Sequence, residues 1–99
     1  MPGRILVIDP VNTNRMVLKT RLMSEYYEVD LCADANAGWA SILRDPPDAV
    51  LVNCRLPDAN RYGFFAKVNS HPDIAHIPLV LIAPDRADAR SPKAYSRFA

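Results

Sequence analysis

The 99-residue chain is predicted to form an α/β domain, a doubly wound parallel sheet in a three-layer sandwich, truncated to about four βα units. Two observations predict this class. Short, β-branched apolar runs alternate along the chain with segments of helical periodicity, and the run in the middle of the chain is apolar throughout, which is typical of a strand covered on both faces. At this length the chain is one domain.

The chain begins with a buried strand and a helix. Residues 4–9, RILVID, are an apolar run that ends on the carboxylate of Asp9. Residues 11–26 have apolar side chains at roughly helical spacing, and Asn12 or Thr13 is suited to cap this helix. Its apolar side is expected to hold Val11, Val17, Leu18 and Leu22.

A second strand and helix follow. Residues 27–33 alternate apolar and polar side chains, which predicts a half-exposed strand at or near an edge of the sheet. Residues 36–43 supply a short apolar helix that can pack on the sheet, and the Pro46-Pro47 pair stops it.

The central strand lies in residues 48–57, DAVLVNCRLP, and breaks at Asn53 into polar and turn residues. Because ligands and reactive groups in open parallel sheets lie just beyond the carboxyl ends of the strands, any chemistry should centre on Asn53. Residues 62–70 predict another helix, and residues 78–83, PLVLIA, a fourth buried strand with proline at its first position.

The residues after Ala83 are mostly polar, with Tyr95 and Phe98 as the large apolar exceptions. We expect residues 1–84 to form the domain and residues 85–99 to be a polar C-terminal helix or tail that adds no buried strand. The fourth strand would then be an uncovered apolar edge, open to self-association through Leu79, Val80, Leu81 and Ile82.

Composition excludes several classes of function. The formal net charge of +1 gives no reason to propose nucleic acid or an anionic membrane as partner, and no apolar run approaches the roughly 20 residues that span a bilayer. A cytoplasmic location is the default expectation. Cys32 and Cys54 lack further ligands at metal-binding spacing, so we expect buried, reduced thiols, no metal site and no cofactor.

Four segments in order, RILVID, YYEVDLCADA, PDAVLVNCRLP and HIPLVLIA, carry a family resemblance that extends from about residue 4 to residue 83. They resemble the receiver domain of bacterial two-component response regulators, and most of all the first receiver of PleD-type diguanylate cyclase regulators. The resemblance implies a flavodoxin-like (CheY-like) sheet in strand order 2-1-3-4-5. It also implies a phosphorylated aspartate after the third strand, Mg²⁺ held with acids of the first strand, a hydroxyl after the fourth strand and a lysine after the fifth.

This chain departs from the family pattern at nearly every chemical position. The phosphoacceptor position is Asn53, and a carboxamide does not form an acyl phosphate. The acidic pair after the first strand is Asp9 and Pro10, which leaves one carboxylate for a metal that prefers several. The hydroxyl position is Ala83, and the lysine has no counterpart. We therefore interpret Asp9, Pro10, Asn53, Arg55 and Ala83 as a degenerate phosphoacceptor pocket.

The sequence thus predicts a pseudo-receiver without enzymatic activity, whose function is protein interaction or dimerisation in two-component or cyclic-di-GMP signalling. Its expected partner is a second copy of the chain, a cyclase or another regulator. Two alternatives stay open: phosphorylation at a displaced aspartate, Asp58 or Asp9, and a small flavodoxin-like ligand-binding protein using Asn53 and Cys54. The second would need a phosphate-cradling glycine loop or an acid/base pair, and the chain has three glycines, none in such a loop.

Overall fold

A computed structural model describes residues 3–59, 61–82 and 95–97. These residues form one five-stranded sheet in the order β2-β1-β3-β4-β5, whose first four strands are parallel and whose last pairing is antiparallel. The strands are β1 (Arg4–Ile8), β2 (Glu28–Cys32), β3 (Ala49–Asn53), β4 (Leu79–Ile82) and β5 (Tyr95–Arg97). The described helices are α1 (Asn12–Ser24), α2 (Ala35–Arg44) and α3 (Arg61–Asn69).

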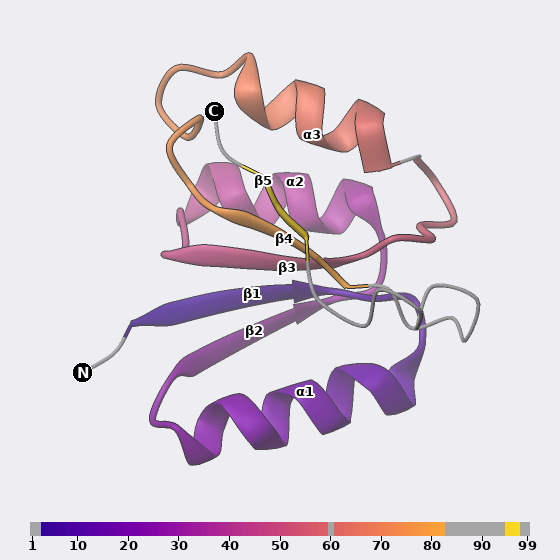
Figure 1. Cartoon of the computed structure of the whole chain (residues 1–99), viewed down its shortest axis with the longest axis vertical. Helices are drawn as coiled ribbons and strands as arrows, with labels where there is room; N and C mark the ends of the chain where they lie inside the picture. The colour runs from indigo at the N-terminus through magenta and orange to yellow at the C-terminus, as the bar shows by residue number, and fades with distance from the viewer. Residues whose placement is uncertain (1–2, 60, 83–94, 98–99) are drawn as a thin grey trace.

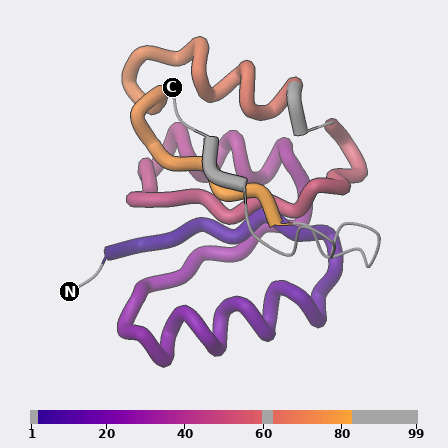
Figure 2. Tube along the Cα trace, in the orientation of Figure 1, coloured from indigo at the N-terminus to yellow at the C-terminus, as the bar shows by residue number. Residues whose placement is uncertain are grey.

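Within the described residues, the sheet has one helix on one face and two on the other. Figure 1 shows α1 below the sheet and α2 and α3 above it, and Figure 2 shows the same layers along the Cα trace. The main hydrophobic core lies between the sheet and the α2 and α3 side, where Ile42, Val68 and Ile74 pack against alternate residues of the strands. The predicted fold class, a doubly wound parallel sheet with four parallel strands, is confirmed.

Strand β3 sits in the middle of the sheet, as its apolar sequence predicts. Its Val50 and Val52 are fully buried, and it pairs with β1 on one side and β4 on the other. Strand β2 is an outer strand with exposed Glu28 and Asp30, in agreement with its alternating sequence. Charged side chains on an outer strand discourage pairing with another chain.

The expected face and cap of α1 are wrong in detail. Leu18 and Leu22 are half-buried, but Val11 and Val17 are 47% and 51% exposed, and α1 has no buried residue. Val17 is more exposed than its neighbour Leu18, although both line a cavity between α1 and the end of β4. The N-cap position is Val11, which has no side-chain cap bond, while Asn12 Oδ1 accepts a bond from the Arg15 guanidinium instead.

Strand β5 contradicts two further expectations. Residues 95–97 form a strand although their sequence is largely polar, and they pair antiparallel with Leu79–Leu81 of β4. Edge hydrogen bonding uses backbone N–H and C=O groups, so a segment with little apolar character can still supply it. The edge of β4 is therefore not the uncovered edge that the sequence predicted, and the expected route to self-association loses its basis. Residues 83–94, which include Ala83, lie outside the described residues.

Candidate functional site

Asp9 and Asn53 lie side by side where two neighbouring strands end. Ile8 of β1 is paired with Val52 of β3, so the residues that follow them come together at the carboxyl edge of the sheet. Both side chains are buried, with 2% of Asp9 and 3% of Asn53 exposed. The structure thus brings together the two polar residues that the sequence placed at this edge.

Each of these side chains is held by the backbone just after it. Asp9 Oδ1 accepts a hydrogen bond from Val11 N at 2.8 Å, and Asn53 Oδ1 accepts one from Arg55 N at 2.7 Å. Both are local turns closed by a side chain, a common use of Asp and Asn. Arg15 adds a bond from its guanidinium to the Asp9 carbonyl oxygen at 2.6 Å. In each of the two residues, one side-chain oxygen is thus already bonded to a backbone amide.

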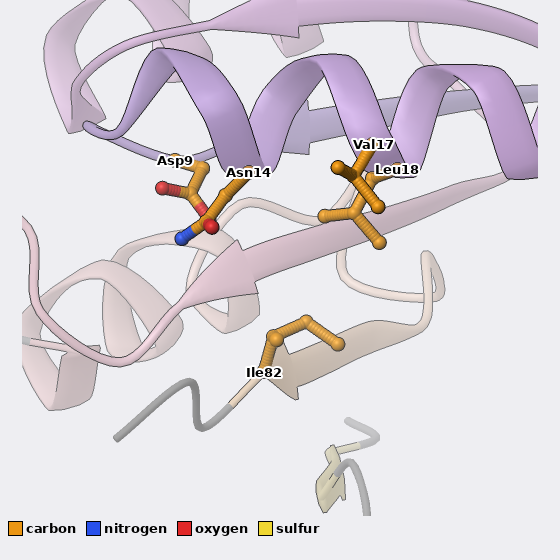
Figure 3. Close-up of a pocket in the computed structure, with 5 residues that line it drawn as sticks. All are labelled: Asp9, Asn14, Val17, Leu18 and Ile82. Carbon is orange, nitrogen blue, oxygen red and sulfur yellow. The ribbon is translucent and has the colours of Figure 1, made fainter. Parts of the chain in front are cut away.

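A cavity of about 210 Å³ opens beside Asp9, between α1 and the end of β4. Its lining residues are Asp9, Asn14, Val17, Leu18 and Ile82. Figure 3 shows Asp9 and Asn14 close together, Val17 and Leu18 together farther along α1, and Ile82 on β4. The sequence reasoning did not single out Asn14. Among the other predicted pocket residues that the structure describes, Pro10 is half-buried and Arg55 is exposed, and neither is among the lining residues of this cavity.

Asp58 has a role that the sequence did not indicate. It lies in the loop between β3 and α3, and its two carboxylate oxygens accept bonds from Ala35 N at 2.8 Å and Asn36 N at 2.9 Å, at the start of α2. These two amides hold the pKa of the Asp58 carboxyl below its usual value, because they bond to its charged form. No sequence spacing links Asp58 to residues more than twenty positions earlier, so the contact is visible in the fold alone.

The two cysteines differ in burial. Cys54 is 8% exposed and belongs to the hydrophobic core, as predicted, whereas Cys32 is half-buried at the end of β2. Burial, followed by the charges of Asp30 and Asp34, raises the pKa of the Cys32 thiol. A raised pKa leaves less thiolate at neutral pH, so Cys32 is poorly suited to act as a nucleophile.

The residues at the strand ends do not fit the Mg²⁺ that the receiver family implies. In the described part of the chain, no three His, Cys, Asp or Glu side chains come together as a metal site. At the edge itself one carboxylate, Asp9, stands beside a carboxamide and a proline, and Asp9 Oδ1 and Asn53 Oδ1 are both bonded to backbone amides. Within the same residues, no helix is long and apolar enough to cross a membrane.

The architecture defines the class of protein. The order β2-β1-β3-β4 of parallel strands, with one helix on one face and two on the other, is the flavodoxin-like arrangement of receiver domains. Solved receiver structures share it. The receiver of the sensor histidine kinase PA1611 from Pseudomonas aeruginosa aligns with a TM-score of 0.80 at 25% identity, over 91% of this chain and 75% of that one. The chemotaxis regulator CheY4 of Vibrio cholerae aligns with a TM-score of 0.81 at 17% identity, over 91% and 75%.

Sequence comparison leads to the same family. The chain is 37% identical over 82 residues to the response regulator PleD of Caulobacter vibrioides, which covers 83% of this chain and 18% of PleD. It is 33% identical over 90 residues to the response regulator MprA of Mycolicibacterium vanbaalenii, which covers 91% of this chain and 38% of MprA. No family model matches the chain. The chain is a CheY-like receiver domain, and it spans less than two fifths of the length of these curated relatives.

Proposed function

We propose that this chain is a pseudo-receiver, a receiver domain that accepts no phosphoryl group and works through protein interaction in two-component or cyclic-di-GMP signalling. The observation that carries the proposal is Asn53. It occupies the end of the central strand, it is 3% exposed, and its Oδ1 is bonded to Arg55 N. A carboxamide is not an anionic nucleophile, so an acyl phosphate does not form at this position.

The geometry of the two other candidate acceptors supports the proposal. Both oxygens of Asp58 accept bonds from amides of α2, and one oxygen of Asp9 accepts a bond from Val11 N. Phosphorylation of Asp58 would turn one of its two oxygens into the bridging oxygen of an acyl phosphate and would break the bond that this oxygen accepts from α2. Asp9 is 2% exposed, which restricts the approach of a phosphoryl donor.

The proposed partner is a protein. Relatives such as PleD are response regulators in which a receiver is part of a longer chain, so a cyclase or another regulator is a natural partner for this module. The sequence predicts dimerisation with a second copy through β4, but β5 occupies that edge. A dimer therefore needs another surface.

Phosphotransfer is tested by incubating the full chain with acetyl phosphate and Mg²⁺ and following the intact mass, with a receiver that has the usual aspartate as positive control. We expect no phosphoryl adduct on the wild type. An adduct that disappears in Asp58→Asn or Asp9→Asn would overturn the proposal in favour of a displaced acceptor. The matched variant Asn53→Asp returns a carboxylate to the usual position and reports whether the rest of the pocket can support transfer.

The interaction is tested by light scattering across a concentration series, with and without Mg²⁺ and beryllofluoride, which mimics a phosphoryl group. An oligomeric state that ignores both additives supports a phosphorylation-independent module. A shift from monomer to dimer that needs both additives would mean that an acidic pocket still works, and the assignment of Asn53 would then be wrong.

A further inference from the structure

The side chain of Asp58 bonds the loop between β3 and α3 to helix α2. Asp58 reaches across the carboxyl edge of the sheet, and its carboxylate accepts bonds from the amides of Ala35 and Asn36 at 2.8 and 2.9 Å. The partners are 23 and 22 positions away in the chain, so these bonds join two separate elements. Figure 1 shows the two elements meeting at this edge, where the chain from β3 passes the first turn of α2 on its way to α3.

Helix α2 already has an N-cap side chain, so the bonds of Asp58 to this helix do not replace a missing cap. Asp34 is the N-cap residue, and its side chain accepts a bond from Ala37 N at 2.8 Å. One such side chain is the usual provision for a helix N-terminus. With Asp58 added, each of the first three amides of α2 donates to a carboxylate. Asp58, unlike Asp34, belongs to a loop distant in the sequence, so its bonds also fix that loop to the helix.

The helix to which the loop is fastened is itself closely seated on the sheet. Gly38 of α2 packs so near β1 that a methyl group on it would overlap Cδ1 of Ile8 and lie 2.9 Å from Cγ1. Ile8 is fully buried and is followed directly by Asp9. Asp58 therefore connects its loop, through α2, to the strand that ends at the candidate site.

The start of the same loop is also held. Cys54 N donates to Ile82 O at 3.0 Å, and Arg55 N donates to Asn53 Oδ1 at 2.7 Å. Two residues, Leu56 and Pro57, separate Arg55 from Asp58. A segment this short, with fixed bonds at both ends, has little freedom to change its path without breaking one of them.

We propose that Asp58 is a positioning residue that latches the β3–α3 loop to α2 and so keeps the surroundings of Asn53 in one arrangement without a metal ion or a phosphoryl group. The inference rests on the proposed function, because a module that does not switch needs this loop held by its own side chains. It assigns Asp58 a structural role in regulation in place of the acceptor role that the sequence left open.

The test is amide hydrogen exchange measured by NMR on the full chain, for the wild type, Asp58→Ala and Asp34→Ala. We expect Asp58→Ala to speed exchange at Ala35, Asn36 and Arg55 by at least about tenfold, because the loop is released together with the helix amides. Asp34→Ala is the matched control, since it removes a carboxylate from the same helix end and leaves Asp58 bonded. It should speed exchange at Ala37 and leave Arg55 unchanged.

Two results would overturn the latch. If Asp58→Ala speeds exchange at Ala35 and Asn36 but not at Arg55, Asp58 caps the helix without positioning the loop. If Asp34→Ala loosens Arg55 as much as Asp58→Ala does, the loop follows fraying of the helix. If Asp58→Ala does not fold, Asp58→Asn is the second variant, because its side chain keeps one acceptor oxygen. Faster exchange at one of the two amides, Ala35 or Asn36, together with a smaller increase in the exchange rate at Arg55, would support the latch.

The exchange experiment tests the latch separately from the phosphotransfer experiment, which tests the proposed function. A phosphoryl adduct on the wild type would refute the pseudo-receiver whatever the exchange rates are. Unchanged exchange at Arg55 in Asp58→Ala, with no adduct on the wild type, would refute the latch alone.

Discussion

Replacing Gly38 by alanine tests how closely α2 is seated on β1. In an exposed helix this substitution gains about 1 kcal/mol, because alanine is the better helix former. At Gly38 the new methyl group overlaps Cδ1 of Ile8 and lies 2.9 Å from its Cγ1, and Ile8 is fully buried. Overpacking of this kind costs about 1–3 kcal/mol, so we expect a net loss of about 1 kcal/mol in the free energy of unfolding. Urea unfolding followed by circular dichroism measures it.

A double-mutant cycle with Ile8→Val identifies the cause of that loss. Alone, Ile8→Val should cost about 1 kcal/mol, since it removes a buried methyl group. In the Gly38→Ala background it removes the overlapping Cδ1, and its cost should fall by about 1 kcal/mol, which appears as a favourable interaction energy. Gly63→Ala is the matched control, because Gly63 is exposed in α3. If Gly38→Ala stabilises the chain as Gly63→Ala does, or the cycle is additive, the close seating of α2 is refuted.

Three further predictions concern charges around the sheet. Arg4→Gln should lower the free energy of unfolding by about 1–2 kcal/mol, because the Arg4 guanidinium, 18% exposed, bonds Asp30 at 2.5 Å and Asp45 at 3.0 Å and also donates to the Pro46 carbonyl. Arg21 has no ion pair within the described residues, so the control Arg21→Gln should change the free energy of unfolding by less than about 0.5 kcal/mol. Equal effects of the two substitutions would contradict the stabilising role of Arg4. The pKa of Asp58 is lowered on folding by the amides of Ala35 and Asn36. The stabilising contribution of the Asp58 carboxylate is therefore complete above its pKa in the unfolded chain and is lost as pH falls through its pKa in the folded chain. The difference in urea midpoint between wild type and Asp58→Asn should be largest near neutral pH and shrink in acid, and a difference independent of pH would refute this prediction. Asn53→Asp should lower the free energy of unfolding by about 1–3 kcal/mol at pH 7, because it buries a second carboxylate beside Asp9. Acid should reduce this loss of stability. Equal losses in urea titrations at pH 7 and pH 4 would show that the carboxylates of Asp9 and residue 53 do not interact.

The fold could be predicted from the sequence because its strongest signals are local. The apolar runs of β1, β3 and β4 each place a strand correctly to within a residue or two, and the alternation in β2 places it at an edge. The same reasoning put Asp9 and Asn53 at the carboxyl ends of strands, and parallel pairing brought them together. These inferences use periodicity and strand direction, which a sequence contains directly.

The errors fall where a segment is defined by what it contacts. Tyr95–Arg97 has no strand signal of its own, and it forms a strand because β4 offers unpaired backbone groups. Val17 has the apolar character of a core-facing residue, yet it is 51% exposed where it lines a cavity, because burial depends on what packs against a helix as well as on its sequence. The bonds of Asp58 to α2 likewise depend on two segments meeting that the sequence keeps apart.

The strand-end pair of Asp9 and Asn53 has a single carboxylate where two neighbouring strands end. Two buried carboxylates at adjacent strand ends would repel each other and would need a cation to offset the repulsion. Here one of the two is a neutral carboxamide, and one oxygen of each residue accepts a bond from a backbone amide two positions later. On the proposed function, Asn53 has two consequences: it lacks the anionic nucleophile that phosphotransfer needs, and it lacks the second charge that a cation would offset. Because both effects follow from the same side chain, a return of phosphotransfer through Asn53→Asp should bring back a need for Mg²⁺.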